Sequence, residues 1–233
     1  MELWGGYNFK RLQVMTFMPY VISHKESDDG FTKSQGIGDW MVLVNYKVVS
    51  STALSKNEKA SIRHEIYVGG GIKLPTGLNQ VNTSDPGFNI GDFNSQAGTG
   101  SVDYILNASH NLLWNKGGIV TNVAYRMNTS NEQKYKFGNR SYVSSSYYYS
   151  IIKSKTKILP NAGISFQSNN INTFNGVKVE DSNGYTLNST VGLNILRNKI
   201  GFNAIAFIPL TQNNYDGQTK LKSRILLGVT YSF

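Results

Sequence analysis

The last fourteen residues, 220–233, alternate between apolar and polar side chains up to the C-terminal phenylalanine. Ser223 is the only exception on an apolar face that consists of Leu221, Ile225, Leu227, Val229, Tyr231 and Phe233. Leu226 is the only exception on a polar face that consists of Lys220, Lys222, Arg224, Gly228, Thr230 and Ser232. A period of two indicates a β-strand with one apolar and one polar side.

The same alternation recurs along the chain, and no segment of useful length has a helical period of 3.6 residues. Residues 184–196, 37–50 and 60–74 show it most clearly. The pattern predicts eleven strands, near 2–10, 11–20, 37–50, 60–74, 99–112, 117–127, 140–153, 157–167, 184–196, 199–211 and 219–233. We find no second domain and no linker.

The expected connections alternate in length. Short turns are predicted near 10–11, 114–117, 154–156 and 197–198, and a medium one near 51–59. Long loops rich in Asn, Ser, Asp and Gly are predicted at 21–36, 75–98, 128–139, 168–183 and 212–218. Short turns on one rim and long loops on the other are typical of outer-membrane barrels. The sequence therefore predicts an all-β fold, an antiparallel transmembrane β-barrel in the bacterial outer membrane.

The composition excludes several kinds of site and several classes of protein. The chain has no cysteine, which excludes disulfides and thiolate metal sites, and no apolar run reaches the ~18 residues of a membrane helix. The net charge is +9, but the basic residues are spread over turns and strands rather than gathered in a block. We therefore expect no nucleic-acid partner. A soluble all-β barrel is the alternative at the level of the fold.

The order of the strands leads to an expectation about the N-terminus. If Phe233 is periplasmic, eleven strands place Met1 on the extracellular side. Bacterial single-chain barrels have an even number of strands. We therefore expect residues 1–233 to form one barrel domain that is truncated at its N-terminus, with the signal peptide and the first of twelve strands absent. The closing aromatic pair, Tyr231 and Phe233, resembles the assembly signal by which such barrels are recognised by the barrel-assembly machinery.

An ordered set of short segments resembles a known family. The segments are Glu2–Tyr7, Pro19-Tyr20, Gly36–Asp39, Gly71–Gly77, Gly98–Asp103, Tyr125-Arg126 and Tyr135–Asn139. In this order they resemble the outer-membrane barrel family named for the meta-pathway of phenol degradation, and the variant is similar to transporter proteins of Bacteroidetes, which are Gram-negative. The resemblance implies a β-barrel with a transport role and an undefined substrate.

Charged residues on the polar faces are the candidate lining of the barrel lumen. They are Asp39, Lys47, Arg63, Glu65, Lys73, Asp103, Arg126, Lys222 and Arg224. Two interpretations stay open: a polar pore that selects solutes by charge, or a salt-bridge network that fills a small barrel. For Asp39 and Asp103 a cation or substrate contact near the mouth competes with ordinary turn chemistry, which we favour.

No motif points to catalysis, a metal or a cofactor. The run Gly69-Gly70-Gly71 is not followed by the Lys-Ser/Thr of a phosphate loop, so we interpret it as a strand bend or a close backbone approach. The histidines His24, His64 and His110 have no partner at ligand spacing, and His64 falls on the lipid-facing side. We expect an outer-membrane channel for an unidentified small solute rather than an enzyme. The alternatives are a closed barrel that acts through its loops and, less favoured, a lipid enzyme.

Overall fold

The computed structural model describes residues 1–27, 30–54, 61–217 and 219–233, with side chains described except at 23–34 and 52–61. Eleven antiparallel strands form one continuous sheet, and consecutive neighbours follow the chain. These strands are β1 (Glu2–Phe9), β2 (Leu12–Ser27), β4 (Trp40–Leu54), β5 (Ser61–Leu74), β6 (Asp103–Trp114), β7 (Gly117–Met127), β9 (Arg140–Tyr149), β11 (Thr156–Asn169), β14 (Gly184–Arg197), β15 (Ile200–Asn214) and β16 (Arg224–Tyr231). The predicted all-β fold with eleven strands is confirmed.

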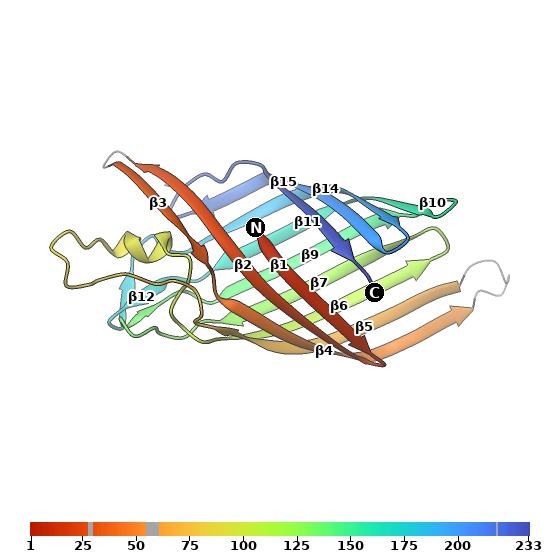
Figure 1. The fold of residues 1–233 in the computed structure, drawn as a ribbon, viewed down its shortest axis with the longest axis horizontal. Coiled ribbons are helices and arrows are strands. Elements are labelled where there is room, and N and C mark those ends of the chain that lie inside the picture. The colour runs from red at the N-terminus through yellow and green to blue at the C-terminus, as the bar shows by residue number, and fades with distance from the viewer. Residues whose placement is uncertain (28–29, 55–60, 218) are drawn as a thin grey trace.

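The sheet curls into a half-barrel. In Figure 1 the edge strand β1, its neighbour β2 and the other edge strand β16, which ends beside the C label, lie toward the viewer, and the middle strands β6 to β11 lie behind them. The tight turns gather at one end, and the long connections extend from the other. Lys10, Ser154 and Asn198 have φ angles of 53°, 51° and 54°, as the mirror-image turns of two-residue hairpins require.

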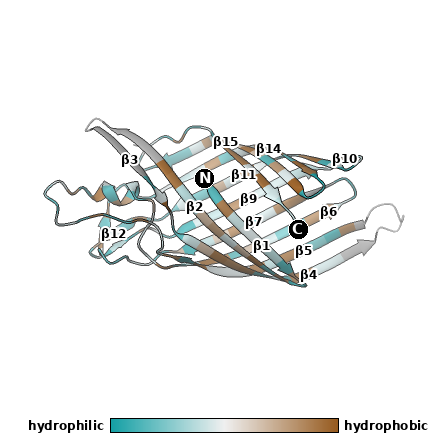
Figure 2. Cartoon of the chain, viewed as in Figure 1, coloured by the Kyte–Doolittle hydropathy of each residue, from teal (hydrophilic) through white to brown (hydrophobic). Residues whose placement is uncertain are grey.

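Polar residues are enclosed on one face of the sheet, and apolar residues are exposed on the other. Buried polar side chains include Asn45, Ser165 and Thr186, whereas Val191 and Leu227 are 56% and 78% exposed. Figure 2 shows hydrophobic and hydrophilic residues following one another along the same strands. This distribution of polar and apolar side chains is the reverse of that in a water-soluble protein. It fits a sheet whose outer face contacts lipid.

Short elements occupy the long connections. Strand β3 (Gly30–Ile37) extends β2 as a hairpin, so the prediction of a loop at 21–36 was wrong. The loop after β5 contains a 3-10 helix, η1 (Ile90–Ser95), and β8 (Tyr135–Lys136), β12 (Asn172–Phe174) and β13 (Val177–Val179) form a separate small sheet. Strand β10 (Ile151–Lys153) adds a short pairing to β11. None of the helices in the described ranges is long and apolar enough to span a membrane.

Several strand boundaries differ from the prediction. Residues 99–102 precede the strand, which begins at Asp103, and Thr99 and Ser101 there bond to the carboxylates of Asp39 and Asp103. The last strand begins at Arg224 rather than 219, so Lys222 precedes it. A register shift between Lys47 and Val49 interrupts the alternation of β4, which leaves Val48 outside the regular outward series. The predicted turn near 51–59 lies partly outside the described residues.

Candidate functional site

The inner face of the half-barrel is the candidate site, and strand register determines which residues reach it. In register, Lys73 of β5 lies opposite Met41 of β4 on one side and opposite Asp103 of β6 on the other. The inward-facing residues of β5 and β6 are therefore the odd-numbered ones. Of the predicted lining, the register places the following inward: Lys47, Arg63, Glu65, Lys73, Asp103, Arg126 and Arg224. Their role as a selective pore lining stays a prediction.

The Lys73 cluster is the most enclosed group of charges on this face. We define it as Lys73, Asp39, Asp103, Thr99 and Ser101. The Nζ atom of Lys73 lies 2.6 Å from Asp39 Oδ2 and 3.1 Å from Asp103 Oδ2, and it also donates to the Ser101 carbonyl at 2.9 Å. Lys73 additionally bonds Thr99 Oγ1. The two carboxylates thus share one buried cation, which offsets the cost of enclosing all three charges.

Asp39 connects this cluster to the backbone of the long loop after β5. Its carboxylate accepts from the Gly77 amide at 3.1 Å and from the Thr99 amide at 2.9 Å. Burial by itself raises the pKa of Asp39, but the hydrogen bonds from Lys73 and Thr99 outweigh it and hold the pKa below its ordinary value. These contacts favour the structural interpretation of Asp39. Asp103 is similarly occupied, accepting from Ser101 Oγ at 2.9 Å and from the Thr129 amide at 3.0 Å.

A second ionic group lies toward the tight-turn end. Glu65 lies 3.4 Å from both Lys47 Nζ and Arg63 Nε, and Lys47 also lies over the ring of Tyr67 at 5.1 Å. Arg63 is about half exposed, with 52% of its side chain accessible. This group is therefore in contact with solvent, unlike the Lys73 cluster.

A ladder of amides crosses the inner face between these two groups. Asn107 Nδ2 donates to Asn45 Oδ1 at 2.7 Å, and Asn45 Nδ2 donates to Gln13 Oε1 at 3.1 Å. Gly69 lies between Asn45 and Asn107 in register, and a side chain there would collide with Asn45. The interpretation of the glycine run as a close approach is therefore confirmed at this position.

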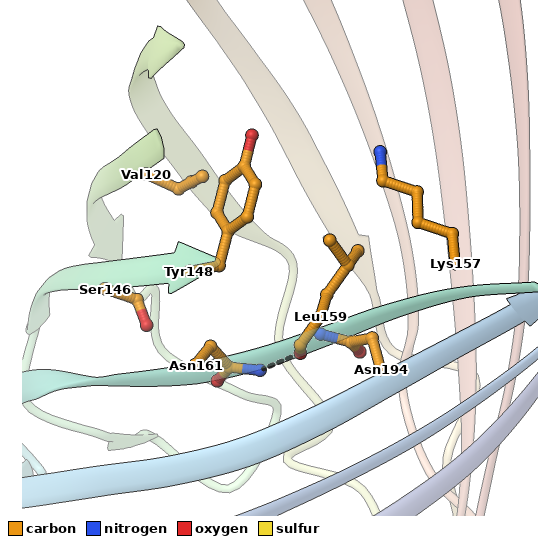
Figure 3. A pocket seen from close by; sticks show the side chains of 7 residues that line it. All are labelled: Val120, Ser146, Tyr148, Lys157, Leu159, Asn161 and Asn194. Carbon is orange, nitrogen blue, oxygen red and sulfur yellow. Dashed lines mark hydrogen bonds between the residues drawn. The ribbon is translucent and has the colours of Figure 1, made fainter. Parts of the chain in front are cut away.

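A cavity of about 250 Å³ opens on the inner face, between β7, β9, β11 and β14. Its lining consists of Val120, Ser146, Tyr148, Lys157, Leu159, Asn161 and Asn194. Figure 3 shows the Tyr148 hydroxyl and the Lys157 ammonium extending into the same space, above the hydrogen bond from Asn161 Nδ2 to the Leu159 carbonyl. None of these residues is in the predicted lining, although their alternation with apolar neighbours marks the inward face.

Part of the inner wall is apolar rather than polar. The register of β2 and β4 places Met15, Phe17, Met41 and Leu43 inward. Arg224 lies over the ring of Phe207 at 4.7 Å, where β15 pairs with β16. The lumen surface therefore combines apolar patches with fixed charges.

The long loops pack around a small apolar core of their own, which we call the loop cluster. Its buried residues are Val81, Phe93, Tyr135 and Phe137, and partly buried neighbours are Phe88, Ile90, Phe174 and Val179. Phe93 stacks on Tyr135 with ring centroids 4.1 Å apart. Burial raises the pKa of the Tyr135 hydroxyl, and the hydrogen bond from Asn172 Nδ2 at 2.7 Å partly offsets this.

The structure brings two histidines together on the outer face. His64 Nδ1 and His110 Nε2 are 3.1 Å apart, and the rings stack. Sequence spacing did not reveal this contact, because His64 and His110 are 46 positions apart and meet only through the pairing of β5 with β6. The side chain of His24 lies outside the described part. Among the described residues, no group of three or more His, Asp or Glu could hold a metal ion.

Comparisons with known proteins agree with this geometry. No protein-family model matches the chain, and no curated protein matches it. The crystal structure of an outer membrane channel from Pseudomonas putida F1 matches over 99% of this chain and 80% of its own, with a TM-score of 0.62 and 16% identity. At this level of identity the likeness shows a shared outer-membrane β-barrel fold.

Proposed function

We propose that this chain acts as a channel-like barrel of the bacterial outer membrane through which a small solute passes. The observation that carries the proposal is the reversed polarity of the sheet, with enclosed polar groups inside and exposed apolar groups outside. The cavity lined by Tyr148 and Lys157 offers room on the inner face. The likeness to the outer membrane channel from Pseudomonas putida F1 supports the same function.

Conductance of the full chain in planar bilayers tests this proposal. We expect discrete current steps, with an ion selectivity that changes in Arg63→Gln and Glu65→Gln because both side chains belong to the solvent-contacting ionic group. Lys178→Gln is a matched control, since Lys178 is an exposed residue of the small loop sheet. Silent bilayers in which insertion has been demonstrated would reject a channel.

A closed barrel acting through its loops is the second candidate, and the loop cluster is the observation that favours it. Long loops with their own apolar core present a defined surface rather than a flexible one. Silence in bilayers, together with a partner that binds the wild type but not a variant lacking the loop cluster, would support this alternative.

Outer-membrane lipid and the barrel-assembly machinery are the partners that the C-terminal strand favours. Tyr231 is 61% exposed and Phe233 is 97% exposed, so both aromatic rings are accessible. We expect Phe233→Ala to lower the yield of inserted protein in cells without changing stability after refolding in detergent. Equal insertion of both proteins would argue against this role.

A further inference from the structure

Two arginines lie opposite each other on the inner face, near the long-loop end of the sheet. Arg126 of β7 and Arg140 of β9 are direct partners in the antiparallel register. Side chains at such positions point to the same face, with Cβ atoms roughly 5 Å apart, and like charges there destabilise the pairing. Arg126 belongs to the predicted lining, and Arg140 does not.

The carboxylates nearby are already engaged. Asp103 and Asp39 act electrostatically on Arg126, yet in the described part of the chain neither lies within ion-pair distance of it. Both acids bond to Lys73 instead. Three cations and two carboxylates therefore share this region, so one positive charge is in excess.

The Arg126 side chain also contains a buried donor without an acceptor. Its Nε atom is enclosed and has no hydrogen-bond partner in the described structure, whereas nearly all buried polar groups in native proteins have one. Arg140 is exposed, and its register with Arg126 places it on the inner face. A ligand that reaches Arg140 can therefore approach the pair from the lumen.

We propose that Arg126 and Arg140 form a binding site for a solute oxyanion, a carboxylate or phosphate group. Guanidinium groups bind such anions through paired, charge-assisted hydrogen bonds. A bound anion would neutralise the excess charge and remove the repulsion across β7 and β9. The inference rests on the proposed channel function, because the solute must enter the lumen.

A structural water is the competing explanation. The Oδ1 atom of Asn128, two residues along the chain, is a buried acceptor without a partner. Water bound at Arg126 Nε and at Asn128 Oδ1 would satisfy the two atoms. This explanation predicts no anion affinity, so binding measurements separate the two.

The test is titration calorimetry of the full chain in non-ionic detergent, with inorganic phosphate and with acetate, at constant ionic strength in chloride. We expect saturable binding that weakens about tenfold or more in Arg126→Gln and in Arg140→Gln, since each loses a charge-assisted hydrogen bond. Arg140→Lys keeps the charge but not the planar fork, and we expect it to bind more weakly than the wild type. Heat-modifiable gel mobility identifies folded variants.

Arg197→Gln is the matched control. It removes the same charge from an exposed arginine at the end of β14, outside the predicted lining, and we expect unchanged affinity. Equal weakening in Arg197→Gln, or no saturable binding by the wild type, would overturn the inference. If the protein conducts normally but calorimetry detects no anion binding, the anion site alone is rejected. If anions bind but the protein does not conduct, the channel function alone is rejected.

Discussion

Lys73 is 2% exposed and bridges two carboxylates, Asp39 and Asp103, that are themselves almost fully enclosed. A buried ion pair contributes little net stability, but removing one partner leaves an uncompensated charge. Its position also matters, because Asp39 bonds the amides of Gly77 and Thr99 at both ends of the loop after β5. The cluster thus holds that loop to the sheet.

We expect Lys73→Met to lower the free energy of unfolding by about 3–5 kcal/mol, since two buried carboxylates lose their cation. Urea unfolding in detergent measures this change. Lys222→Met removes the same charge from an exposed residue before β16, and we expect a change of less than about 0.5 kcal/mol. Equal effects of the two substitutions would contradict a structural role for the cluster.

The lowered pKa of Asp39 predicts the pH range in which its contribution is lost. A carboxylate with a folded pKa below its ordinary value of 3.8 stabilises the protein above that value, and the stabilisation disappears as pH falls through the folded pKa. We expect the stability difference between wild type and Asp39→Asn to be constant from about pH 5 to 7 and to shrink below about pH 4. A difference that grows as pH falls would reverse the assigned direction.

At the scale of elements, aromatic packing joins the long loops to one another, in addition to the bonds by which the Lys73 cluster holds the loop after β5 to the sheet. Phe93 comes from η1, Tyr135 from β8 and Phe174 from β12, and their rings lie within 6.5 Å of one another. Asn131 ties this cluster to the Lys73 cluster through the Thr99 carbonyl at 3.1 Å. Contacts between three separate loops explain their ordered conformation.

We expect Phe93→Ala to destabilise the loop cluster by about 3–5 kcal/mol while the sheet stays folded. Limited proteolysis should then cut within 75–98 many times faster, with heat-modifiable mobility unchanged. Val177→Ala, at a residue that is 70% exposed, serves as the control and should leave the cleavage rate as in wild type. Protection of 75–98 in Phe93→Ala would show that the aromatic core does not hold the loop.

At the scale of the whole molecule, the two faces of the sheet favour opposite kinds of side chain, apolar on the outer face and polar on the inner face. Val191 is 56% exposed near the middle of β14 and faces outward, whereas Asn194 lines the inner cavity. The same arginine should therefore have different effects at two positions only three residues apart. A charge that faces lipid has no water to solvate it, but a charge in the lumen does.

We expect Val191→Arg to cost about 2–4 kcal/mol in a lipid bilayer, and Asn194→Arg to cost much less. Urea titration of protein folded into phosphatidylcholine vesicles measures both. Equal costs would mean that the outer face of β14 does not contact lipid.

The sequence alone determined which side of each regular strand is apolar. A period of two fixes that side without knowledge of any neighbour, which is why Leu227, Val229 and Tyr231 could be placed on the outer face in advance. The strand count followed for the same reason. The alternation did not hold where the backbone is not a regular strand. These places are the bulge beside Val48 and the segment around Lys222, which precedes β16.

Only the tertiary structure decided which inward and outward residues meet. Asp39 reaches Thr99 across 60 positions, and His64 meets His110 because β5 and β6 pair in one particular register. Arg140 faces Arg126 for the same reason. Alternation is a property of one strand, whereas register is a relation between two strands. The contacts that make up the candidate sites therefore belong to the folded sheet.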